Sequence, residues 1–206
     1  MRADATKSGP AKADSRTTSG IAFGGRPDRQ YYFAYGANMN AAQMAERCSR
    51  PVVFAVAKLP GHRIGFHGRS EVWDGALETA VPAPGHDLWG VVYELTFMDL
   101  QRLDEWQDAR LDGGGNYFHY PVQVTDAAGS TLTALLYKKD LLGPARAPSR
   151  EYLERIVQGA TARGLPADYV ESLRRTASVP ASYPVPDRGD TLREIRVITS
   201  CSECGA

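Results

Sequence analysis

The chain has 206 residues, 43% of them hydrophobic, which is enough for one domain with a buried core and flanking tails. Its 24 basic and 24 acidic side chains cancel, so the charge balance indicates neither nucleic acid nor a membrane surface as a partner. The sequence has no apolar run long enough to span a membrane and no apolar signal-peptide core. Its three cysteines are too few for a disulfide framework, so we expect a cytoplasmic protein.

Composition divides the chain into three parts. Residues 1–29 are mostly polar and are predicted to form a disordered or loosely attached N-terminal tail. Residues 30–178 carry the periodic apolar segments and are expected to form the folded domain. Residues 179–206 begin Pro-rich and are treated as a C-terminal extension. If this extension folds back over a pocket in the domain, it would suit a specialised substrate.

The segment around Gly36 is predicted to form a strand, a turn and a helix in succession. Residues 31–35 include four aromatic side chains, which is typical of a buried strand. Gly36 tolerates crowded backbone that other residues do not, Asn40 favours a helix cap, and a helix is predicted over 41–47. Such a junction gathers backbone N–H groups that bind an anion or stabilise an oxyanion, although an ordinary strand–helix turn has the same pattern.

The remaining segments alternate strands and helices. A helix is predicted from the Thr96 cap to about Gln107, and two more begin near Ser149 and Pro166. The long βαβ rhythm of a parallel sheet is missing, which favours an α+β domain with a mostly antiparallel, curled sheet. Strands are predicted over 51–57, 62–66, 76–80, 88–95, 117–125, 130–137 and 191–199, with a turn at 82–85.

Several motifs resemble, in order, those of the γ-glutamylcyclotransferase family. Residues 35–39, Tyr-Gly-Ala-Asn-Met, are similar to its Tyr-Gly-Ser-Asn-Leu/Met signature, with Ala37 in place of the serine. A Trp-Gly-Val-Val strand at 89–92, a Leu-x-x-Leu-Asp helix at 100–104 and a Gly-Leu-Pro segment at 164–166 follow. The resemblance covers about residues 31–175 and implies a small, mixed, barrel-like α+β fold flanked by helices.

The resemblance implies an enzyme that cyclises a γ-glutamyl amide and releases 5-oxoproline and a free amine, with no cofactor. The substrate's α-amine attacks its own γ-carbonyl, so the enzyme must fold the substrate back, stabilise an oxyanion and supply a base. The Asn at position 38 suits the branch that acts on γ-glutamyl amino acids or amines better than the glutathione-specific branch. The residues expected to bind the substrate are Tyr35, Gly36, Ala37, Asn38, Met39 and Tyr117.

Position 107 departs from the family pattern. The family's base is the glutamate of a Leu-Asp-x-x-Glu motif, and here that position holds Gln107. An amide has nearly the shape of a carboxyl group, but it cannot shuttle a proton at neutral pH. Three interpretations stay open. The chain is a Glu-to-Gln variant that has lost its base, or Asp108 or Glu105 has taken over the role, or the protein binds its ligand without turnover.

The first interpretation implies that Gln107→Glu raises 5-oxoproline release by about 10²–10⁴-fold, and an unchanged rate would exclude residue 107 as the altered base.

Two other functions remain as alternatives: a non-catalytic γ-glutamyl or small-amide binding protein on the same fold, and a γ-glutamyl amide hydrolase. A small γ-glutamyl compound is the expected partner, and a monomer or homodimer is expected. No spacing of His, Cys and Asp predicts a metal site, and Cys201 and Cys204 lack the second pair that a zinc site needs.

Overall fold

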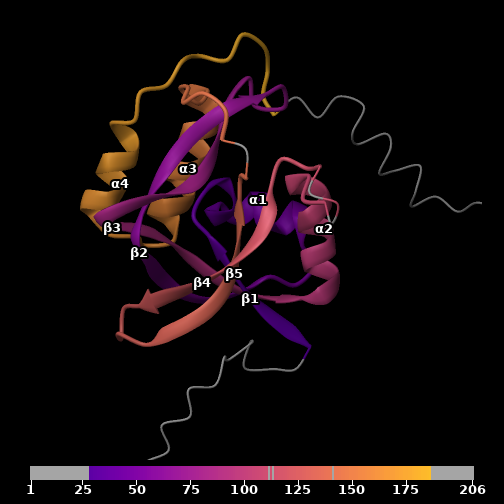
Figure 1. Cartoon of the computed structure of the whole chain (residues 1–206), viewed down its shortest axis with the longest axis vertical. Coiled ribbons are helices and arrows are strands. Elements are labelled where there is room, and N and C mark those ends of the chain that lie inside the picture. The colour runs from indigo at the N-terminus through magenta and orange to yellow at the C-terminus, as the bar shows by residue number, and fades with distance from the viewer. Residues whose placement is uncertain (1–27, 111, 113, 141, 187–206) are drawn as a thin grey trace, which may run out of the picture.

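The computed structural model describes residues 28–110, 112, 114–140 and 142–186. Within these ranges, five strands close into a barrel in the order β1-β3-β2-β4-β5 (Figure 1). β1 and β5 are parallel, with Tyr32 opposite Leu135, and the other neighbouring strands are antiparallel. The predicted α+β domain with a mixed, mostly antiparallel, barrel-like sheet is therefore confirmed. The strands are β1 Arg29–Ala34, β2 Val52–Ser70, β3 Gly75–Thr96, β4 Phe118–Asp126 and β5 Thr131–Lys138.

β2 and β3 are far longer than the sequence pattern predicts. Each covers two of the strands expected separately, so the turn predicted at 82–85 is wrong: these residues lie inside β3. The two strands stay paired across a large bulge, in which residues 83–86 of β3 face Gly61 of β2. Gly61 and Gly85 both have positive φ, 69° and 82°, which lets the paired strands bend there. Pro and Gly signal a bulge as strongly as a turn, so local sequence could not separate the two.

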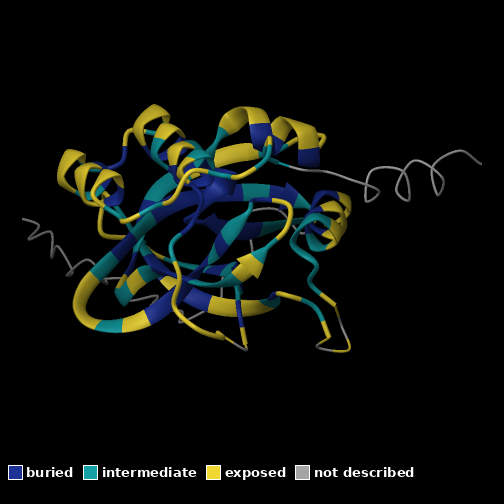
Figure 2. Cartoon of the chain, turned by 90° about the horizontal axis from the view of Figure 1, so that it is seen from above, coloured by how far each residue is buried: buried dark blue, intermediate teal, exposed yellow. Residues whose placement is uncertain are grey.

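In the described part of the chain, four helices pack against the barrel and leave its lower side in Figure 2 uncovered, with their buried residues turned toward the strands. The predicted helix over 41–47 is confirmed residue for residue, and the Asn40 side chain caps it by accepting from the backbone N–H groups of Ala42 and Gln43. Thr96 and Ser149 cap the next two helices in the same way. The helices are α1 Ala41–Arg47, α2 Phe97–Gln107, α3 Arg150–Ala162 and α4 Ala167–Arg174, and a 3₁₀ turn, η1 Ala37–Met39, precedes α1.

The aromatic strand β1 is buried on both faces. Tyr32 and Ala34 belong to an apolar cluster that includes residues of the surrounding helices. Tyr31 and Phe33 face the opposite way, into a cluster formed mainly by the other strands. Burial on both sides explains why this segment is continuously apolar, and it fixes the point at which the chain leaves the barrel toward η1.

Some predictions concern residues that lie outside the described ranges: the tail over 1–27, the strand at 191–199, and Cys201 and Cys204. The first residues of the predicted C-terminal extension are described, and they lie on the domain. The Val179 N–H donates to the Pro148 carbonyl at 3.1 Å, and the Val179 carbonyl accepts from the Arg150 N–H at 2.7 Å. Among the described helices, none has the length and apolar character needed to cross a membrane.

Helix α3 approaches η1 closely at Gly159. A Cβ at this position would lie 2.6 Å from the Asn40 backbone nitrogen and 2.8 Å from the Met39 carbonyl carbon. Gly-to-Ala changes inside helices normally stabilise a protein by about 0.5–1 kcal/mol. Here we expect Gly159→Ala to lower the free energy of unfolding by about 1–3 kcal/mol, because the methyl group overlaps backbone.

Urea unfolding measures this difference. Gln158→Ala, at an exposed position of the same helix, is the matched control and should change stability by less than about 0.5 kcal/mol. Equal or higher stability of Gly159→Ala would show that the contact between α3 and η1 does not constrain the turn.

Candidate active site

The turn after β1 forms one wall of the candidate site. The Met39 N–H donates to the Gly36 carbonyl and the Asn40 N–H donates to the Ala37 carbonyl, both at 3.0 Å. These two N–H groups therefore hold the turn together. The Ala37 N–H points the other way and donates to the carboxylate of Glu78.

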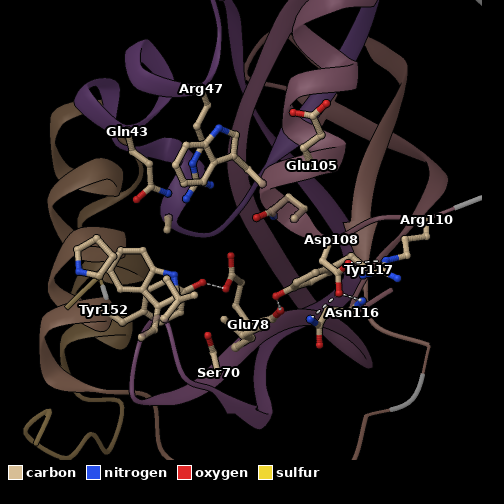
Figure 3. Close-up of a pocket in the computed structure, with 17 residues that line it drawn as sticks. Gln43, Arg47, Ser70, Glu78, Glu105, Asp108, Arg110, Asn116, Tyr117 and Tyr152 are labelled. Atoms are coloured by element: carbon tan, nitrogen blue, oxygen red, sulfur yellow. Dashed lines mark hydrogen bonds and ion pairs between the residues drawn. The ribbon is translucent and has the colours of Figure 1, made fainter. Parts of the chain in front are cut away.

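A cavity of about 380 Å³ lies between this turn, the ends of β2 and β3, and helices α1, α2 and α3 (Figure 3). Volumes of this order accommodate small organic ligands. Of the residues predicted from sequence to form the site, Ala37, Gln107 and Tyr117 line the cavity. The structure thus places the turn after Gly36 and position 107 at the same cavity, although they lie far apart in the sequence.

Tyr35, Gly36, Asn38 and Met39 are buried behind the wall and are not among the residues that line the cavity. The Tyr35 hydroxyl donates to the Tyr137 carbonyl at 2.5 Å. The Asn38 Oδ1 accepts from Arg47 Nη1 at 2.6 Å. The side chains of Tyr35 and Asn38 consequently support the turn from the core.

Glu78, which sequence reasoning did not select, lies at the centre of the cavity (Figure 3). Glu78 lies on β3, opposite Phe66 of β2, and is only 6% exposed. The Tyr152 hydroxyl donates to Glu78 Oε2, as the dashed line in Figure 3 marks. A Cβ at Gly36 would overlap the Glu78 carboxylate, so a glycine is needed there to let the carboxylate reach the backbone of the turn.

Burial dominates the charge state of Glu78. It raises the pKa of the carboxyl from the ordinary 4.5 to about 7. The N–H groups of Glu78 itself and Ala37, and the positive charges of Arg47 and Lys139, oppose this by favouring the ionised form. The balance leaves a carboxyl group that can both accept and release a proton near neutral pH.

The two carboxylates that sequence reasoning offered as substitutes also line the cavity, but in different settings. Asp108 ends α2 with φ of 47°, and both its oxygens are engaged: Oδ1 accepts from Arg110 Nε at 2.8 Å, and Oδ2 accepts from Asn116. Glu105 is exposed, and its side chain points away from Glu78 (Figure 3). Asp108 therefore closes a loop, and Glu105 is solvated at the rim.

The sequence held one signal that could have found Glu78. In the predicted strand over 76–80, Ala-Leu-Glu-Thr-Ala, Glu78 shares one face with Ala76 and Ala80, because side chains alternate along a strand. Small apolar residues on both sides favour burial of that face, and the structure buries both alanines. A buried acid is rare enough to mark a candidate site.

The C-terminal segment reaches the cavity as well. The Ser182 N–H and hydroxyl both donate to Asp74 Oδ2 at 2.6 Å, and Pro186 lines the cavity. Val72 and Trp73, from the connection between β2 and β3, also line the cavity. Residues beyond the predicted domain boundary therefore form part of the pocket wall.

The chain is similar to proteins of one family. A model described as the AIG2-like family matches residues 87–173. The γ-glutamylcyclotransferase of Homo sapiens is 32% identical over 154 residues, which cover 72% of this chain and 80% of the relative. The γ-glutamylcyclotransferase of Bos taurus is 31% identical over 146 residues, which cover 69% of this chain and 76% of the relative. A solved structure named γ-glutamyl cyclotransferase matches with a TM-score of 0.70 and 28% identity, over 81% of this chain and 98% of that one.

The raised pKa of Glu78 makes a prediction about stability and pH. A carboxyl whose pKa is about 7 when folded and near 4.5 when unfolded supports the fold below pH 4.5, and that support is lost as the pH rises through 7. Glutamine at the same position is neutral throughout. Between pH 4.5 and pH 8, Glu78→Gln should therefore gain about 3 kcal/mol of unfolding free energy relative to the wild-type chain.

Urea unfolding of both proteins across this pH range measures the gain. Glu154→Gln, the same chemical change at an exposed position of α3, should follow the wild-type pH profile. Parallel profiles for Glu78→Gln and the wild-type chain would mean that Glu78 ionises as an ordinary surface glutamate.

Proposed function

The chain belongs to the γ-glutamylcyclotransferase family, and we propose that it cyclises the γ-glutamyl group of a γ-glutamyl amino acid or amine. The α-nitrogen of the substrate forms a bond to its γ-carbon, the bond from that carbon to the amide nitrogen breaks, and 5-oxoproline and the free amine leave. One proton must leave the α-nitrogen and one must reach the departing nitrogen. No oxidant, reductant or second substrate is needed.

The observation that carries this proposal is the single cavity shared by the turn after Gly36, position 107 and a buried carboxylate. Cyclisation joins two ends of one molecule, so the effective concentration of the attacking amine is already high once the chain is folded back. A small pocket lined by both polar and apolar side chains can hold the substrate in that folded form. A carboxyl group that changes charge near neutral pH supplies the proton transfer.

The lining of the cavity supports a set of proposed substrate-binding residues. We propose that Ala37, Tyr117 and Gln107, which line the cavity, contact the γ-glutamyl group, and that Gly36 shapes the turn that carries Ala37. The Tyr117 hydroxyl is fixed by donating to the Glu78 carbonyl at 2.7 Å, so its ring is held as a wall. Tyr35, Asn38 and Met39 contribute by keeping the turn rigid.

Cations on the cavity wall suit a substrate that carries an α-carboxylate. Arg47 is buried beside the turn, with its guanidinium 5.1 Å from the centre of the Trp106 ring. Arg110 lies at the other end, paired with Asp108. Trp73 and Pro186 also line the cavity and are the residues that we propose to contact the leaving amine.

The sequence left a non-catalytic binding protein and a hydrolase as alternatives. The relatives named as cyclotransferases favour cyclisation over both. A hydrolase would have to admit water to attack the γ-carbonyl faster than the substrate's own amine, which the intramolecular geometry disfavours. A cytoplasmic location and a monomeric or dimeric state stay predictions from the sequence.

Product analysis tests the proposal. The full chain should be incubated with γ-glutamyl amino acids, γ-glutamyl amines and glutathione, and the products quantified by mass spectrometry. We expect 5-oxoproline and free amine in equal amounts, with glutathione the poorest substrate because of the Asn38 motif. Glutamate as the main product would identify a hydrolase, and binding without any product would identify a binding protein.

A further inference from the structure

Position 107 does not supply the proton carrier that the reaction needs. The amide of Gln107 donates and accepts hydrogen bonds but carries no proton between the two nitrogens. The reaction nevertheless needs a group that takes a proton from the attacking amine and returns one to the leaving amine. Three acidic side chains line the cavity within the described residues: Glu78, Glu105 and Asp108.

Two of the three are poorly placed for this task. Asp108 is ion-paired with Arg110 at 2.8 Å and accepts two hydrogen bonds from Asn116, so it is bound to a cation and joins the end of α2 to Asn116. Glu105 is exposed, with its carboxylate turned away from the cavity centre (Figure 3). An exposed carboxylate is held in no fixed geometry for proton transfer.

Glu78, the third acid, is well placed for proton transfer. Resting on the proposed function, we propose that Glu78, reaching the cavity from β3, is the catalytic acid–base of the cyclisation and replaces the glutamate that the family carries on α2. Its carboxylate touches the Gly36–Ala37 turn that grips the γ-glutamyl group, and the Tyr152 hydroxyl orients it. As the new C–N bond forms, Glu78 accepts the proton of the α-nitrogen, and it then donates a proton to the departing nitrogen.

The burial of Glu78 supports a functional role rather than a structural one. Asp99 is the other buried acid among the described residues, and its burial is explained by the start of α2: its oxygens accept from the Ser49 N–H at 2.6 Å and the Thr96 hydroxyl at 2.8 Å. Glu78 caps no helix. It faces a cavity, which is where a perturbed acid is expected to act on a ligand.

The charge state of Glu78 depends on groups from every element packed around it. Cationic groups are Arg47 of α1 and Lys139 after β5, and both favour the ionised carboxylate. Burial lowers the pKa of Lys139, so this cation is itself weakened. The phenols that face Glu78 are Tyr32, Tyr35, Tyr117 and Tyr152, and α2 contributes Glu105 and Asp108 across the cavity.

This assignment gives the Gln107 amide a compatible role. A carboxylate at 107 would face Glu78 across one small cavity, and two nearby carboxylates cannot both ionise freely. A neutral amide avoids this repulsion and still hydrogen-bonds the substrate. On this account Gln107 belongs to the working site.

The test compares 5-oxoproline release by the wild-type chain, Glu78→Gln, Gln107→Glu and the exposed control Glu154→Gln. We expect Glu78→Gln to lower kcat by about 10²–10⁴-fold with KM changed less than about threefold, and Gln107→Glu to give no increase. Glu154→Gln should match the wild-type chain. For the wild-type chain, kcat/KM should fall below about pH 7, and the residual activity of Glu78→Gln should lose that dependence.

The outcomes separate this inference from the proposed function. A wild-type chain that releases 5-oxoproline while Glu78→Gln stays within tenfold of it, or loses affinity alone, overturns the role of Glu78 and leaves the cyclotransferase intact. An inactive wild-type chain with an active Gln107→Glu variant places the base at 107 and also overturns it. Absence of 5-oxoproline from every variant rejects the proposed function and the inference together. Loss of folding is excluded by the urea unfolding curves of the same variants.

Discussion

The candidate site depends on the contact between the buried Glu78 carboxylate and the backbone turn at Gly36 and Ala37. Burying an ionisable group costs free energy, and Glu78 offsets part of that cost with the Ala37 N–H, the Tyr152 hydroxyl and the charges of Arg47 and Lys139. Those partners come from η1, α3, α1 and the end of β5, so the carboxylate is held by four separate elements. Two glycines make the arrangement possible: Gly36 leaves room for the carboxylate, and Gly159 lets α3 approach the turn.

The chemistry explains why such a carboxylate can enter from a different element than in the family motif. Cyclisation is intramolecular, so most of the rate comes from holding the substrate folded, and the protein adds a proton carrier and hydrogen-bond donors. A proton carrier must lie near the two nitrogens, but nothing ties it to a particular helix or strand. β3 runs past the Gly36 turn opposite the end of α2, so either element can deliver an acid to the same cavity. The amide at 107 then needs no loss of function to explain it.

Local features of the fold were predictable from the sequence, and long-range ones were not. The Asn40 cap, the bounds of α1 and the β4–β5 pair follow from side-chain chemistry and alternation within a few residues. The continuity of β2 and β3 through their Pro- and Gly-containing bulge depends on pairing between distant segments, which no local pattern reveals. Gly36 was recognised as a special position, yet its φ is −119°, so the reason is space for Glu78 rather than left-handed backbone. Glu78 itself was missed because only the closed barrel shows that residues 76–80 face the turn, and the motif drew attention to 107.

The most direct measurement is the titration of Glu78 in the folded enzyme, followed by carbon-13 NMR of glutamate-labelled protein and assigned by comparison with Glu78→Gln. The account predicts a midpoint near pH 7 that coincides with the midpoint of kcat/KM against pH for a γ-glutamyl amine. A midpoint near the ordinary 4.5, or one that differs clearly from the kinetic midpoint, would contradict the claim that this carboxyl group carries the proton.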